Sequence, residues 1–384
     1  MTVIAIFEGL GIGISDLLMS RDVRGKWMYL PSLGEPPDHI QQLSFSPTRL
    51  VRKVGYLAVG ASATQFLICG TVAHAESFLK IAQELVSGNL APPLVAPLNR
   101  DDMASVLTHA AEFSRVKREV DFAALAFRGV HSIIVGRTIR LDLPYFGKIT
   151  LGGSGAPALE EFLRNQSYRY QRDFGDESDF GKGMRVAHHL PMQLLAADRR
   201  NPSITLSKGV GGFYEVWFNL NSGLGEDDMG WVRILADVEP PYARGVTVRA
   251  LWWHAYAQGD LVVASAPCEE SFLAPGATVS IPKEKIKVDR FPTFTDFVQR
   301  QPPSIDSLLP KIVRAKFFTS SLSLSRDGND FLATTMATRN LSVFQISWDR
   351  TGIRIKLDKD RFLGVIGALS KASVFSEHSD DDGG

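Results

Sequence analysis

The first sixteen residues limit the fold of this chain more than any other stretch. After Met1 the sequence reads TVIAIFEGLGIGISD, an apolar run with β character that meets Gly9, Gly11 and Gly13 and ends at Asp16. Glycines in this arrangement occur in loops that hold the phosphates of a dinucleotide, and also in tight hairpins where backbones pack closely. The choice between these structures separates a nucleotide-binding protein from one whose N-terminus has another role.

The glycine spacing argues against a nucleotide-binding loop. A dinucleotide fingerprint needs Gly-x-Gly-x-x-Gly between a strand and a helix. Counted from Gly9, the third glycine is replaced by Ile14; counted from Gly11, it is replaced by Asp16, whose carboxylate would repel a pyrophosphate. A proline-rich segment at 31–47 then follows, where a second buried strand would be needed. The sequence therefore predicts a hairpin and no nucleotide cofactor.

The composition is that of a globular protein without a general affinity for polyanions. The 384 residues are 45% hydrophobic and 22% charged, and 42 Lys and Arg residues balance 42 Asp and Glu residues. Nucleic-acid binding normally needs an excess of positive charge, so nucleic acid is not an expected partner. The length suits two domains.

Cysteine content and hydropathy predict a cytoplasmic protein. Cys69 and Cys268 are the only cysteines, which excludes a disulfide framework and indicates a reducing compartment. No apolar run reaches about 18 residues, so no membrane span is expected. The N-terminus also lacks the basic start of a signal peptide.

The histidines and cysteines do not form a recognised metal-binding pattern. None of the eight histidines belongs to an HExxH motif, and two distant cysteines do not supply zinc spacing. His188 and His189 are adjacent, so on a helix their side chains would point about 100° apart and would not share one ion. We expect neither a metal nor another cofactor.

The chain divides into two parts and a short tail. Over residues 1–222, strand-like segments alternate with pairs of helix-like segments. The stretch NSGLGEDDMG (221–230) is the predicted boundary. Residues 231–375 are rich in strand-like runs such as GVTVRALWWHAYA and DLVVASA. Residues 376–384 form an acidic tail.

Apolar spacing predicts two helices after the strand VGYLAV. Over residues 73–87 apolar side chains recur at helical intervals, and Gly88 ends the pattern. A second helix is predicted over 103–119, with Asp101 or Asp102 as its N-cap. Its apolar residues spread over more than one face, so part of it needs a partner beyond the core. A neighbouring subunit is the expected partner, and the C-terminal domain is the alternative.

Four segments, taken in order, resemble the 20S-proteasome β-subunit and bacterial HslV group of Ntn hydrolases. MTVIAIFEGLGIGISD is similar to their first hairpin, and LAVGASATQFLICGTVAHAESFLKIAQEL to their central strand, glycine turn and first long helix. ITLGGSGAPALEEFLRNQ is similar to their Gly-Ser-Gly turn with its flanking strand and third helix. LLAADRRNPSITLSKGVGG is similar to their fourth helix, acidic turn and last hairpin. The resemblance covers about residues 2–220.

The resemblance implies an α+β fold, a four-layer αββα sandwich, to which the β-rich C-terminal domain is an addition. It also implies amide hydrolysis by an N-terminal threonine, whose hydroxyl is the nucleophile and whose own α-amine is the base. Thr2 would take this role once Met1 is removed. Asp16 matches the acidic position after the second strand, Ser154 the serine that supports the amine, and Asp198 the last acidic position.

The lysine expected beside the nucleophile is where this chain departs from the family. Counted back from the strand at Leu57, the lysine position falls on or near Arg49 or Leu50. Arginine supplies positive charge but does not release a proton near neutral pH. Lys53 would share a strand face with Arg49, so a shift of register would bring Lys53 to this position instead.

Two functions follow from these assignments. In the first, the chain is a proteasome- or HslV-like threonine peptidase or amidohydrolase that acts as a homo-oligomer, either a dimer or a ring. In the second, the Ntn fold is an inert scaffold and the C-terminal domain binds a partner. Arg49 in place of a lysine supports the second function. So does a rival N-terminal register, in which Met1 takes the nucleophile position and Thr2 lies outside the site.

Overall fold

A computed structural model describes the chain as two compact units. The described residues are 2–21, 24–59, 62–89, 99, 102–116, 119, 122–128, 131–203, 205–218, 229–237, 246–257, 260–299, 317–326, 329–338, 344–349 and 351–364. The first unit comprises Met1–Gly223 and Phe291–Pro303, and the second comprises Leu224–Arg290 and Ser304–Gly384. Residues 291–303 thus belong with the N-terminal part, although the sequence analysis assigned them to the C-terminal domain. The expected acidic tail, 376–384, lies outside the described residues.

The first unit is built from strands β1 to β11 and helices α1 to α6. Its strands are β1 (Ile4–Phe7), β2 (Ile12–Asp16), β3 (Leu18–Arg21), β4 (Ser46–Leu50), β5 (Val54–Val59), β6 (Ser62–Cys69), β7 (Ala123–Arg128), β8 (His131–Gly136), β9 (Thr138–Leu143), β10 (Gly147–Gly152) and β11 (Tyr214–Phe218). Its helices are α1 (Asp38–Gln41), α2 (Val72–Ser87), α3 (Met103–Phe113), α4 (Ala156–Phe174), α5 (Asp179–Arg200) and α6 (Phe294–Gln299). The strand orders are β11-β2-β1-β10-β9, β5-β6-β7-β8 and β3-β4.

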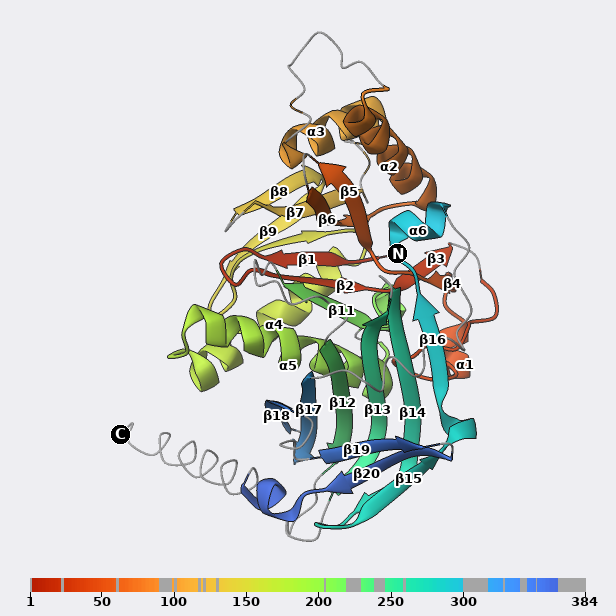
Figure 1. Cartoon of the computed structure of the whole chain (residues 1–384), viewed down its shortest axis with the longest axis vertical. Helices are drawn as coiled ribbons and strands as arrows, with labels where there is room; N and C mark the ends of the chain where they lie inside the picture. Colours follow the sequence, from red (N-terminus) through yellow and green to blue (C-terminus); the bar gives the residue numbers. More distant parts are fainter. Residues whose placement is uncertain are drawn as a thin grey trace. The chain divides into compact units, whose positions relative to one another are not determined.

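These elements are stacked as helix, sheet, sheet and helix (Figure 1). Helices α2 and α3 pack on the sheet β5-β6-β7-β8, whereas α4 and α5 pack on the sheet that contains β1 and β2. An apolar cluster lies between the sheets, with Ile4 and Ile6 from β1 facing Leu67 and Leu125. The fold class is α+β with mainly antiparallel sheets.

The predicted N-terminal hairpin is confirmed, and its glycines have separate roles. β1 and β2 pair in antiparallel fashion, and Asp16 is the last residue of β2. Gly11 has a φ of 62°, a backbone conformation that residues other than glycine rarely adopt. A Cβ on Gly13 would lie 2.2 Å from the ring of Trp217, which β11 places against β2. The glycine run therefore closes the turn and makes room for an indole.

The helix predicted over 73–87 is confirmed, whereas the next helix is shorter than expected. Thr71 caps α2 by accepting a hydrogen bond from the His74 backbone, and Gly88 ends the helix with a φ of 81°. Asp102 caps α3, which ends at Phe113 rather than near residue 119. None of the described helices combines the length and the apolarity needed to cross a bilayer.

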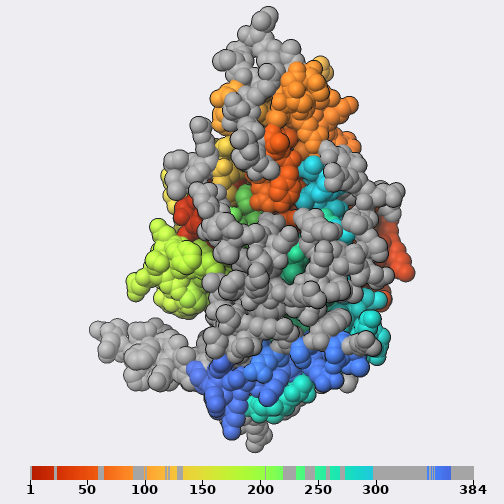
Figure 2. All heavy atoms as spheres, viewed as in Figure 1, coloured from red at the N-terminus to blue at the C-terminus, as the bar shows by residue number. Residues whose placement is uncertain are grey.

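The second apolar face of α3 is covered inside the first unit. Val106, Leu107 and Ala110 are fully buried in one cluster with side chains of α2 and β8. Because a neighbouring subunit is not needed to cover this face, the apolar surface of α3 gives no support to oligomerisation. The most exposed large hydrophobic side chains of the described residues are instead Tyr168 (76%) on α4 and Phe180 (69%) on α5. These helices form the yellow-green surface in Figure 2.

The last hairpin, which the family resemblance implies at the end of LLAADRRNPSITLSKGVGG, does not form among the described residues. A 3-10 helix (Leu206–Lys208) is followed by a glycine-rich turn and then by the single strand β11. Gly209, Gly211 and Gly212 all have positive φ, so the chain turns here instead of extending. β11 then pairs with β2, the strand that ends at Asp16.

The second unit consists mainly of strands. They are β12 (Met229–Asp237), β13 (Val246–Ala257), β14 (Asp260–Leu273), β15 (Thr278–Pro282), β16 (Lys287–Phe291), β17 (Phe317–Arg326), β18 (Asn329–Thr338), β19 (Phe344–Asp349) and β20 (Gly352–Leu357), with a 3-10 helix at Lys283–Lys285. The strand orders are β16-β14-β13-β12-β17-β18 and β15-β20-β19. Its core includes Ile234, Leu251, Leu273 and Ile355.

A fully buried ion pair joins Arg52, just before β5, to Glu215 on β11. Arg52 Nη2 lies 2.5 Å from Glu215 Oε1, and both side chains are inaccessible to solvent. Arg52→Met would leave the carboxylate buried without its counter-charge, so we expect a loss of about 3–5 kcal/mol in the free energy of unfolding. The double variant R52M/E215M removes both charges and should lose less. Urea unfolding measures both losses, and a double variant as unstable as R52M would contradict this account.

Candidate active site

Thr2 lies two residues before the start of β1, against the Gly-Ser-Gly turn that joins β10 to α4. Its backbone nitrogen donates to Ser154 Oγ at 3.2 Å, and its carbonyl accepts from the Gly155 nitrogen at 2.9 Å. Its side-chain Oγ1 donates to Asp16 Oδ1 at 3.4 Å. The structure therefore brings together Thr2, Asp16 and Ser154, three residues that the sequence analysis named.

The Gly-Ser-Gly turn holds Thr2 by close backbone approach. Gly153 has a φ of 93°, and a Cβ on it would stand 2.3 Å from the Thr2 carbonyl oxygen. A Cβ on Gly155 would stand 2.4 Å from the Val210 side chain. Glycine is thus required on both sides of Ser154, because larger residues would push the turn away from Thr2.

Asp16 is a buried carboxylate held by backbone amides. It accepts hydrogen bonds from the Val3 nitrogen at 2.8 Å and the Gly211 nitrogen at 3.3 Å. Burial raises the pKa of the Asp16 carboxyl to about 6, while the Lys53 charge and these two amides act in the opposite direction. Asp16 is therefore mainly ionised at neutral pH, although it is out of contact with solvent.

Lys53 supplies the positive charge at this site. It is 3% exposed, and its Nζ donates to the Leu18 carbonyl at 2.8 Å. Burial lowers the pKa of the Lys53 ammonium to about 8, against the attraction of Asp16, which raises it. The two groups thus form an electrostatic pair in the interior, and an amine with this pKa can gain or lose a proton near neutral pH.

Arg49, which the sequence analysis placed at the lysine position, is exposed on β4 opposite Met19. The count from Leu57 assumed one continuous strand, but β4 ends at Leu50 and β5 begins at Val54. This break between the strands removes the alternation that would have put positions 49 and 53 on one face.

Asp198 lies close to Gly211, the residue whose backbone also contacts Asp16. Asp198 Oδ1 accepts a hydrogen bond from the Tyr214 hydroxyl at 2.9 Å, and a Cβ on Gly211 would lie 2.9 Å from Asp198 Oδ2. The same Gly211 donates its backbone N–H to Asp16. Gly211 and Tyr214 were not predicted from the sequence, although the glycines of KGVGGFY were a signal of close packing.

The Asp198 carboxyl is shifted towards its neutral form. Burial raises its pKa to about 7, the hydroxyls of Ser32, Thr205 and Tyr214 oppose this shift, and the charge of Asp16 adds to it. Burial has the largest effect on the pKa of Asp198, and the charge of Asp16 has the smallest.

The side chains of the cluster offer acid–base and nucleophilic chemistry. The Thr2 hydroxyl donates to a buried carboxylate, and the charge of a buried amine acts on that carboxylate. A hydroxyl, a carboxylate and an amine are the groups that commonly activate a nucleophile. Among the residues that the structure describes, no group of three or more His, Cys, Asp or Glu side chains is arranged to hold a metal ion.

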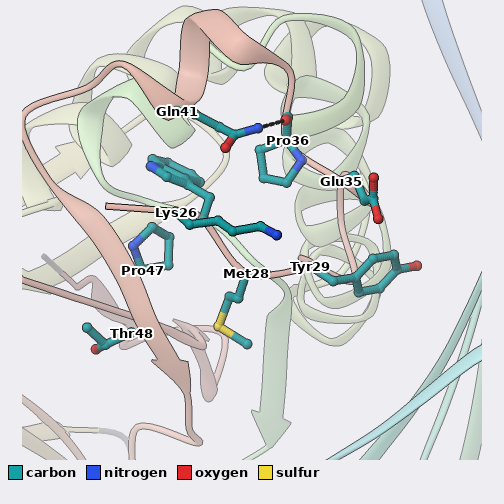
Figure 3. Close-up of a pocket in the computed structure, with 9 residues that line it drawn as sticks. Lys26, Met28, Tyr29, Glu35, Pro36, Gln41, Pro47 and Thr48 are labelled. Atoms are coloured by element: carbon teal, nitrogen blue, oxygen red, sulfur yellow. Dashed lines mark hydrogen bonds between the residues drawn. The ribbon is translucent and has the colours of Figure 1, made fainter. Parts of the chain in front are cut away.

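A pocket of about 680 Å³ lies around residues 26–48. It is lined by Lys26, Trp27, Met28, Tyr29, Glu35, Pro36, Gln41, Pro47 and Thr48. Figure 3 shows the Lys26 side chain extending between the other lining residues, and Gln41 Nε2 donates to the Pro36 carbonyl at 2.8 Å. None of these residues belongs to the cluster around Thr2, so the pocket is a separate feature.

Comparisons of the chain with protein-family models, with curated proteins and with solved structures find no match.

Proposed function

We propose that the N-terminal unit is a proteasome- or HslV-like Ntn hydrolase in which Thr2 cleaves a peptide or another amide. The observation that carries the proposal is that Thr2 bonds to Asp16 and Ser154, while the charge of Lys53 acts on Asp16. These four residues come from the N-terminal hairpin and from two other segments of the chain. The stacking of helix, sheet, sheet and helix supports an αββα sandwich. Assembly into a homo-oligomer is part of the proposal through the family resemblance alone, and location in the cytoplasm through the cysteine content of the sequence.

Removal of Met1 would turn the Thr2 nitrogen into a free α-amine beside Ser154 Oγ. This amine takes the proton from Thr2 Oγ1 as the oxygen attacks the substrate carbonyl carbon. The C–N bond then breaks, and the leaving amine receives that proton from the α-ammonium. Water, deprotonated by the same amine, cleaves the resulting ester, which releases the acid and restores Thr2.

Lys53 and Asp16 set the electrostatics of the attack. Near neutral pH, Lys53 is mainly protonated and Asp16 mainly ionised, because the two pKa values lie at about 8 and about 6. A fixed positive charge favours the developing alkoxide of the nucleophile, most strongly where water is excluded. Asp16 holds this charge in place and also orients Thr2 Oγ1.

The proposal predicts a processed N-terminus and a reactive Thr2. Intact mass should show loss of Met1, and a small β-lactone should acylate Thr2 once per chain. Thr2→Ala should abolish labelling, Thr2→Ser should retain it, and Thr278→Ala, at an exposed threonine of the second unit, should leave it unchanged.

Retention of Met1 would contradict the enzymatic function, because it blocks the α-amine that the mechanism needs. The alternative, an inert scaffold with a partner-binding C-terminal domain, would then be favoured. Processed protein that resists the lactone would favour the same alternative. Lys53 weakens that alternative, since an amine and not the Arg49 guanidinium lies with Asp16.

A further inference from the structure

A segment from the C-terminal half of the chain runs along the strand that follows Lys53. Residues 291–299, here called the strap, belong to the first unit although the residues before them belong to the second. The strap contains the end of β16 and the helix α6 (Phe294–Gln299), which packs on β5. The strap therefore packs within the first unit, against the strand β5.

The strap satisfies backbone groups on the open edge of the sheet β5-β6-β7-β8. β5 is the edge strand, so one row of its N–H groups has no partner within the sheet. Arg52 N donates to the Pro292 carbonyl at 3.1 Å, and Tyr56 N donates to Thr295 Oγ1 at 3.0 Å. These bonds lie on either side of Lys53, at positions 52 and 56.

The strap is itself fixed in place. Thr293 is 1% exposed and caps α6: its Oγ1 accepts from the Asp296 nitrogen at 3.0 Å and donates to Asp296 Oδ2 at 2.9 Å. Phe294 is 4% exposed and packs in the cluster that includes Val51 and Leu57. A segment with a capped helix and a buried aromatic anchor can hold a neighbouring strand in one position.

We propose that the strap is a positioning element for Lys53, with Thr295 as its main side-chain contributor. The Lys53 carbonyl accepts from the Ile68 nitrogen at 2.8 Å on the β6 side, while the strap holds the opposite edge. The backbone of Lys53 is thereby held from both sides, and this sets where its Nζ lies relative to Asp16. The consequence for catalysis rests on the proposed function, whereas the placement of Lys53 does not.

Thr295→Val tests the proposal, because it keeps the shape of the side chain but removes the acceptor of the Tyr56 N–H. In the full-length protein, amide exchange at Tyr56 should accelerate about 10-fold or more relative to wild type, as a native hydrogen bond is lost. Trace acetylation of Lys53, read by mass spectrometry, should rise in parallel. Acylation of Thr2 by the β-lactone should slow about 10-fold, with a shifted pH midpoint. Thr278→Val, at an exposed threonine, is the matched control and should change none of these.

These measurements test the positioning role of the strap independently of the proposed hydrolase activity. Faster Tyr56 exchange with increased Lys53 acetylation supports the strap, even if wild-type Thr2 proves unreactive and the proposed hydrolase fails. Unchanged Lys53 acetylation in T295V overturns the proposal, whatever the activity. If wild-type Thr2 is reactive, unchanged kinetics and an unchanged pH midpoint in T295V overturn it as well. If T295V unfolds, Thr295→Ser, which retains the acceptor, should restore folding and all three wild-type values.

Discussion

Lys53→Met is expected to slow acylation of Thr2 by about 10²–10³-fold, the usual cost of losing one pre-positioned charge at a reacting oxygen. Methionine fills a similar volume, so the packing around the Leu18 carbonyl should survive. The positive charge of Lys53 lowers the pKa of the Asp16 carboxyl and so counteracts the effect of burial. Without the ammonium, this pKa should rise further. The reaction is followed as the rate of β-lactone labelling at pH 7.

Arg49→Met is the matched control for this variant. Arg49 and Lys53 are the two cations that the sequence offered for one position, but Arg49 is exposed on β4 and Lys53 is buried with Asp16. We expect R49M to label at the wild-type rate. A slow R49M with a normal K53M would show that the guanidinium supplies the charge. Equal thermal stability of the three proteins would exclude misfolding as the cause of a slow rate.

Asp198→Asn is expected to stabilise the protein near pH 8. Burial raises the pKa of Asp198 to about 7 from an ordinary value of 3.8, so the native state keeps a proton that the unfolded chain has already released. The native protein binds more protons than the unfolded one between these pH values, so wild-type stability falls as pH rises from about 4 to 7. Asparagine resembles the neutral form and avoids this loss. The gain should reach about 2–4 kcal/mol, since one pKa unit corresponds to ~1.4 kcal/mol.

Urea unfolding of wild type and D198N at pH 5 and pH 8 measures this effect. The difference between the two proteins should be small at pH 5 and large at pH 8. Asp142→Asn, at an exposed carboxylate on β9, serves as the control and should change stability little at either pH. The account would be overturned by a D198N protein that is less stable than wild type at pH 8. In that case the stabilisation from the hydrogen bond that Tyr214 donates to ionised Asp198 would exceed the cost of burying the Asp198 charge.

The features that the sequence determined by itself are local ones. The glycines of the first hairpin, the cap at Thr71 with the stop at Gly88, and the Gly-Ser-Gly turn at Ser154 each depend on conformations of a few neighbouring residues. Positive φ, side-chain capping and close backbone approach leave direct signals in residue type. These signals also placed Thr2 and Asp16 at the two ends of one hairpin, from which their proximity follows.

The tertiary structure decided which distant groups meet. Arg49 and Lys53 could not be separated by alternation, because the break between β4 and β5 depends on the pairing of β4 with β3 and of β5 with β6. The second face of α3 is buried by α2 and β8, which apolar spacing alone could not distinguish from a subunit contact. Thr295 lies 239 residues from Tyr56, and no local pattern marks their hydrogen bond. Burial and charge pairing depend on neighbours brought in by the whole fold, and these set the pKa values of Asp16, Lys53 and Asp198.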